Sequence, residues 1–161
     1  MNGKWPAMIL VAATLAAGGG VWYAQEYGFY ETLDPAGPDA VILATPAGGG
    51  APAQLAVSDF QGIDADSSPM RWRACFRLAA PPAPQDFTPY PDATPLIGPR
   101  WFDCYDAGRI TADLASGAAK AVLGQSGIRP DVDRVLAIYP DGRAYGWHQF
   151  NDKTPERGVM D

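Results

Sequence analysis

The chain has 161 residues, of which 47% are hydrophobic, and it carries a formal net charge of −6 with two Cys and one His. This length suits a single folded domain and argues against a multidomain enzyme. A nucleic-acid-binding protein is expected to present a basic patch, so the acidic balance predicts no nucleic-acid partner.

Residues 7–24 form an uninterrupted apolar stretch of 18 residues without a charge. A helix of this length rises about 27 Å, enough to cross the hydrocarbon core of a bilayer. Lys4 precedes the stretch, and aromatic residues stand near both of its ends. We expect residues 1–26 to be a single-pass anchor in a bacterial inner membrane, with the N-terminus cytoplasmic and the C-terminal domain periplasmic.

A cleaved signal peptide is the alternative for this segment. Small residues suited to a cut occur at Thr14-Leu15-Ala16 and at Ala16-Ala17-Gly18. The apolar run continues past both cut sites, which favours the anchor. Either interpretation exports the rest of the chain.

Ala12, Ala16 and Gly20 recur every fourth residue within the stretch. In a helix they share one nearly flat face, which lets another backbone approach closely. We expect this face to pack against another membrane protein, although Ala-rich spans are common and the three glycines at 18–20 could simply loosen the helix.

Residues 27–52 are rich in Gly and Pro around a short β-like run at 41–44. This composition predicts a tether that touches the domain through one strand. The exported domain proper is expected at 53–161. Residues 27–161 together carry 17 acidic and 11 basic side chains, hence the whole charge of −6.

Residues 71–78 show the clearest strand pattern, because apolar and polar side chains alternate. The pattern places Trp72, Ala74, Phe76 and Leu78 on one face and Arg71, Arg73, Cys75 and Arg77 on the other. One face should therefore be buried and the other polar. Residues 79–99 then hold 7 of the 16 prolines and are expected to form an ordered surface loop.

Asp106 precedes a short amphipathic run at 107–115 that Ser116 and Gly117 end, which predicts an N-capped helix. A strand is expected at 119–123, and a hairpin at 135–139 and 143–150 around the turn Pro140-Asp141-Gly142. Strands outnumber helices and the turns suit antiparallel pairing. The expected fold class is α+β, with an N-terminal transmembrane helix followed by a small antiparallel-sheet domain bearing one short helix.

Cys75 and Cys104 are the only thiols. Export would place them in an oxidising compartment, where an even count favours a disulfide. Such a bridge would draw residues 101–106 across the face that carries Arg73 and Arg77. Asp103 and Asp106 would then be able to meet the arginines in a covered salt-bridge layer.

Two clusters are candidate binding residues. Arg71, Arg73 and Arg77 offer guanidinium groups that suit an acidic partner or a small anion. Asp64 and Asp66 lie in a loop with Ser67 and Ser68 that we include in this contact surface. Pairing within the fold and local Asx or Ser turns are the alternatives. The loop lacks the Gly and Glu of an EF-hand, so no metal site is predicted.

His148 is expected to be a strand histidine beside aromatic neighbours. The chain shows no nucleophile elbow, phosphate-binding loop, zinc-protease helix or haem-attachment motif. We therefore expect no catalytic residues, no cofactor and no enzyme activity.

Four segments carry a resemblance to a known family: DFQGIDADSSPMRWRACF at 59–76, WFDC at 101–104, GWHQ at 146–149 and MNGK at 1–4. With them the chain resembles an uncharacterised family of small, single-span proteobacterial envelope proteins over most of its length. The resemblance implies membrane attachment and architecture, and it implies no activity, substrate or catalytic residues.

Two functions fit these features. The first is a membrane-anchored periplasmic interaction module, an accessory or assembly factor of an inner-membrane complex. The second is a periplasmic sensor or binding domain for a small anion, using Arg71, Arg73 and the loop from Asp64 to Ser68.

Overall fold

The computed structural model describes residues 3–80 and 83–151 and divides the chain into two compact units, 1–30 and 31–161. The first unit holds helix α1 (Lys4–Tyr23) and a π-helical turn (Ala24–Gly28). The second holds the remaining elements: β1 (Glu31–Thr32), a 3-10 turn (Pro38–Ala40), β2 (Leu43–Ala44), β3 (Ala53–Gln54), β4 (Val57–Asp64), β5 (Arg73–Leu78), a 3-10 turn (Pro84–Asp86), α2 (Ala107–Ser116), β6 (Lys120–Arg129), β7 (Val132–Ile138) and β8 (Arg143–Phe150).

Helix α1 contains the apolar stretch seen in the sequence. Within Lys4–Tyr23 no residue is buried, and its large apolar side chains are 57–71% exposed. Twenty residues rise about 30 Å, which matches a hydrocarbon core. This helix is long and apolar enough to span a membrane.

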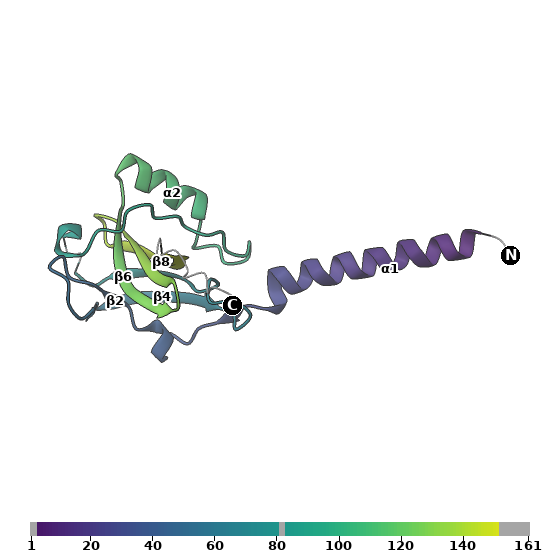
Figure 1. The fold of residues 1–161 in the computed structure, drawn as a ribbon, viewed down its shortest axis with the longest axis horizontal. Helices are drawn as coiled ribbons and strands as arrows, with labels where there is room; N and C mark the ends of the chain where they lie inside the picture. The colour runs from purple at the N-terminus through teal and green to yellow at the C-terminus, as the bar shows by residue number, and fades with distance from the viewer. Residues whose placement is uncertain (1–2, 81–82, 152–161) are drawn as a thin grey trace, which may run out of the picture. The chain divides into compact units, whose positions relative to one another are not determined.

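The second unit is built on a six-stranded antiparallel sheet with the strand order β1-β4-β5-β8-β7-β6. β7 and β8 form the expected hairpin, with Ile138 opposite Ala144 across the Pro140-Asp141-Gly142 turn. β2 and β3 form a separate two-stranded sheet. With one short helix, α2, the domain has the α+β class predicted from the sequence (Figure 1).

Capping residues set both ends of helix α2. The Asp106 carboxylate accepts a hydrogen bond from the Arg109 backbone N–H at 3.0 Å. Gly117 ends the helix with φ of 80°, a left-handed conformation that costs glycine least. Ile110 is buried, so the amphipathic face packs on the domain.

The sheet is covered on both faces, with α2 on one side and the segment around β2 on the other (Figure 1). On the β2 side, Ala40, Ile42 and Ala44 are buried in one cluster with side chains from the sheet. Of the tether predicted at 27–52, residues 31–52 supply two strands, β1 and β2, and part of the core.

The second face of β5 is covered, as expected from the disulfide, although the alternating pattern alone predicted a polar surface. Arg73 is only 3% exposed and Cys75 6%. The predicted disulfide joins Cys75 to Cys104 with a Cα–Cα distance of 6.3 Å and brings the segment before α2 across this face. Tyr105 from that segment packs edge-on to Tyr145 of β8. Buried and exposed side chains do not alternate along β5, because the loop held by the disulfide covers the face that the pattern predicted to be exposed.

The proline-rich segment lies along the outer edge of β6. Thr88 and Tyr90 exchange backbone hydrogen bonds with β6, at 2.8 Å between Leu123 N and Thr88 O and 3.0 Å between Tyr90 N and Ala121 O. Over its described part, 83–99, it is therefore an ordered loop that protects part of an edge strand.

Candidate functional site

The arginines proposed as a binding cluster lie in different surroundings. The Arg73 guanidinium donates to backbone carbonyls of Leu96 and Met70 at 2.9 and 2.7 Å, and also to those of Trp72 and Ile97. Arg77 is exposed and pairs with Asp59 at 4.0 Å. Arg71, just before β5, is half-buried. The Arg73 guanidinium carbon also lies 5.9 Å from the centroid of the Tyr105 ring, and the Asp106 carboxylate caps α2.

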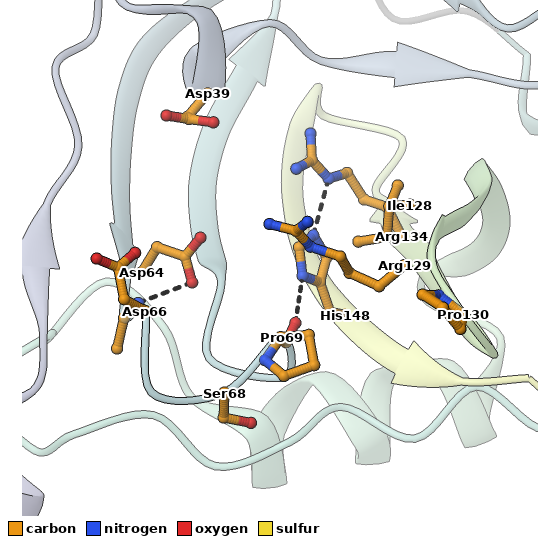
Figure 2. Close-up of a pocket in the computed structure, with 11 residues that line it drawn as sticks. Asp39, Asp64, Asp66, Ser68, Pro69, Ile128, Arg129, Pro130, Arg134 and His148 are labelled. Carbon is orange, nitrogen blue, oxygen red and sulfur yellow. Dashed lines mark hydrogen bonds between the residues drawn. The ribbon is translucent and has the colours of Figure 1, made fainter.

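Asp64 and Asp66, in contrast, line an open cavity of about 470 Å³ at one end of the sheet. The cavity is formed where the β4–β5 connection, the β6–β7 turn and the 3-10 turn at Pro38–Ala40 meet. Its polar lining comprises Asp39, Asp64, Asp66, Ser68, Arg129, Arg134 and His148 (Figure 2).

Opposite charges face one another across this cavity. Figure 2 shows Asp39, Asp64 and Asp66 on one side and Arg129 and Arg134 on the other. The Asp64 carboxylate accepts the N–H of the next residue, Ala65, at 2.8 Å. Burial raises the pKa of Asp64, and the charges of Asp39 and Asp66 raise it further.

Arg134 and His148 are a cross-strand pair of β7 and β8, which explains their contact. Arg134 Nε donates to His148 Nε2 at 3.1 Å, and His148 Nδ1 lies 2.7 Å from the Pro69 carbonyl oxygen. A guanidinium only donates and a carbonyl only accepts, so the imidazole is neutral with its proton on Nδ1. Burial first, and the charge of Arg134 second, lower the pKa of His148 to about 3.

Trp72 packs against both side chains. Its ring stacks on His148 with centroids 5.0 Å apart, and the Arg134 guanidinium carbon lies 4.0 Å from a Trp72 ring centroid. Cation–π contact favours the charged guanidinium. Burial nevertheless lowers the pKa of Arg134 to about 10, so it stays charged at neutral pH.

From the sequence, Asp64 and Asp66 are predicted to lie in a binding surface, whereas Arg129 and Arg134 are not. One signal was present, because the hairpin turn at 140–142 fixes the register that sets residue 134 opposite residue 148. Asp39 carried no local signal, since it reaches the site only through the packing of residues 38–44 on the sheet.

The chain matches DUF6446, a family of unknown function, over residues 42–157. It belongs to this family. The DUF6446 match starts within the folded unit and includes every cavity residue named above except Asp39. The expected resemblance to an uncharacterised family is confirmed to this extent. No curated protein and no solved structure matches the chain.

Among the described residues, no group of three or more His, Cys, Asp or Glu side chains is arranged to hold a metal ion. The cavity combines half-buried Asp64 and Arg134, which are held by hydrogen bonds, with exposed carboxylates and an exposed guanidinium around a neutral imidazole. Such a lining can bind charged groups of both signs.

Proposed function

We propose that this DUF6446 member is a membrane-anchored periplasmic interaction module, an accessory or assembly factor of a bacterial inner-membrane complex. The observation that carries the proposal is helix α1, which has no buried residue and whose large apolar side chains are 57–71% exposed. Apolar surface of this extent is costly in water and is covered by lipid or by a partner helix.

The disulfide supports export of the second unit. Cys75 and Cys104 are joined, and the described residues contain no free thiol. Structural disulfides persist in oxidising compartments such as the periplasm. With Lys4 on the cytoplasmic side, the positive-inside rule favours the same topology.

The side chains that most often carry catalysis are engaged elsewhere, which favours a binding role. Both ring nitrogens of His148 are hydrogen-bonded, and its lowered pKa opposes protonation at neutral pH. Both sulfurs lie in the bridge. We therefore propose that the protein acts by binding rather than by chemistry.

The partner surface that we propose within the membrane is the helix face of Ala12, Ala16 and Gly20. Residues four apart lie one above the other on an α-helix, and all three positions fall inside Lys4–Tyr23. Small side chains on one face let a second helix approach closely. The partner is another membrane protein.

Co-purification from gently solubilised membranes tests the proposal. The native chain should retain a stoichiometric membrane-protein partner, whereas an Ala16→Leu/Gly20→Leu variant should lose it. A matched control, Thr14→Leu/Gly18→Leu, also introduces two leucines but on the opposite side of the helix, and it should keep the partner.

If the native chain purifies without a partner bound through α1, the proposal of an interaction module is contradicted. If such a monomer gained thermal stability on addition of inorganic phosphate, the anion sensor would be the better explanation.

A further inference from the structure

The cavity at the end of the sheet holds charges that face each other without touching. None of the ion pairs among the described residues joins Asp39, Asp64 or Asp66 to Arg129 or Arg134. Asp64 and Arg134 are both half-buried, so each loses hydration. Charged groups that are partly removed from water are stabilised when they pair with an opposite charge. Because these two walls do not pair with each other, a ligand between them could pair with both.

Arg134 is held rigidly for such a role. Its Nε is used by His148, and its planar face rests on Trp72. These contacts leave the edge formed by the two terminal amino groups, Nη1 and Nη2, which no hydrogen bond between described residues occupies. That edge matches the two oxygens of an oxyanion.

The opposite wall is suited to a cation. Asp64 keeps one carboxylate oxygen on the Ala65 N–H, and Asp39 and Asp66 add two further negative charges. An anion alone would face these three carboxylates, and a cation alone would face the two arginines. Only a ligand with both charges meets favourable partners on both walls.

We propose that this cavity binds a small zwitterion, with its oxyanion on Arg134 and its ammonium group on Asp64 and Asp39. A volume of about 470 Å³ accommodates an unblocked dipeptide or the headgroup of an ethanolamine phospholipid. The site lies entirely in the second unit, so it does not depend on the partner proposed for α1.

Calorimetric titration of the full-length protein in a mild detergent tests the site. The probes are L-alanyl-L-alanine and O-phosphoethanolamine, which separate a peptide source from a headgroup source. Binding of either supports the proposal. N-acetylation of the dipeptide, and separately amidation of its carboxylate, should each weaken binding at least about tenfold, because each removes one charge-assisted contact.

Two variants that each replace one aspartate of the cavity by asparagine test the site without disturbing the fold. Asp64→Asn retains the oxygen that accepts the Ala65 N–H, and Asp39 is exposed, so Asp39→Asn should fold normally. Each should weaken binding at least about threefold. Asp59→Asn, which alters an exposed carboxylate paired with Arg77 outside the cavity, should bind as the native chain does.

The proposal is overturned if neither probe binds more tightly than about 10 mM. It is also overturned if the acetylated and amidated dipeptides bind as well as the free one, or if Asp39→Asn and Asp64→Asn bind like Asp59→Asn. Loss of the partner of α1 would leave these results unchanged, so the two proposals fail separately.

Discussion

At the scale of single residues, Trp72 organises the end of the sheet that carries the cavity. It is fully buried, and both His148 and the Arg134 guanidinium lie against its ring. A Cβ at residue 146 would lie 2.7 Å from a Trp72 ring carbon, closer than real Cβ atoms approach. Glycine at this position is therefore required by packing rather than by backbone conformation.

Gly146→Ala should lower the free energy of unfolding by about 1 to 3 kcal/mol, because the added methyl group displaces Trp72. The measurement is the urea midpoint of the full-length chain, followed by tryptophan fluorescence. Gly48→Ala is the matched control, since a Cβ there meets no atom within 4 Å. Equal midpoints for the two variants would contradict the packing described.

His148 makes stability depend on pH. Its folded-state pKa is about 3 against an ordinary value of 6.5. Below pH 6.5 the imidazole is protonated in the unfolded chain but stays neutral in the folded protein. The free energy of unfolding therefore falls as pH falls, by up to about 1.4 kcal/mol per pH unit until the folded pKa is reached.

Comparison of urea midpoints at pH 7 and pH 5 measures this effect. His148→Asn can still donate to the Pro69 carbonyl but does not titrate, so it should lose much less stability than the native chain between these pH values. An equal loss in both proteins would show that groups other than His148 cause the dependence.

At the scale of elements, the disulfide and two short segments determine how the sheet is enclosed. The Cys75–Cys104 bridge fastens the segment before α2 over β5, and residues 38–44 cover the other face. Strand β4, which β1 covers only at Ile63 and Asp64, carries a bulge between Ser58 and Gln61, where Asp59 adopts φ of 53°. A charged bulge of this kind blocks pairing with a further strand.

Reduction of the bridge should lower the free energy of unfolding by about 3 to 4 kcal/mol, because the cross-link closes a loop of about 30 residues in the unfolded chain. Urea unfolding with and without dithiothreitol measures the change. The Cys75→Ala/Cys104→Ala variant serves as the control, since its midpoint should not respond to the reductant. A native midpoint that is likewise insensitive to dithiothreitol would argue against a bridge in the folded protein.

At the scale of the whole molecule, the apolar residues of α1 and the net negative charge lie in different parts of the chain. Lys4–Tyr23 contains no acidic side chain and only one basic one, whereas residues 27–161 hold the net charge of −6. Anionic lipid repels such a domain, so we expect attachment to the membrane to come from α1 alone.

The full chain should therefore stay with membranes through washes in high salt and in alkaline carbonate, which remove electrostatically bound proteins. A version lacking residues 1–26 should appear in the soluble fraction. Mass spectrometry of the membrane-bound protein should find an intact N-terminus. A mature chain starting at Gly18 or nearby would instead identify the segment as a cleaved signal peptide.

Patterns of neighbouring residues predicted the helices and the hairpin that neighbouring residues alone determine. The apolar stretch predicted α1, Asp106 and Gly117 predicted the limits of α2, and the turn at 140–142 predicted the β7–β8 hairpin, because adjacent residues alone set these features. The disulfide also followed from the sequence, since two cysteines allow a single pairing. The alternation in β5 correctly predicted the face of Trp72 but not the burial of Arg73.

Only the tertiary structure decided the binding cavity and the surroundings of the three arginines. Asp39, Asp64 and Arg134 meet because the sheet places β4 and β7 on either side of β5 and β8, and nothing near these residues in the chain specifies that order. The sequence alone determined an acidic α+β domain behind an apolar helix. Long-range packing determined where its charges converge.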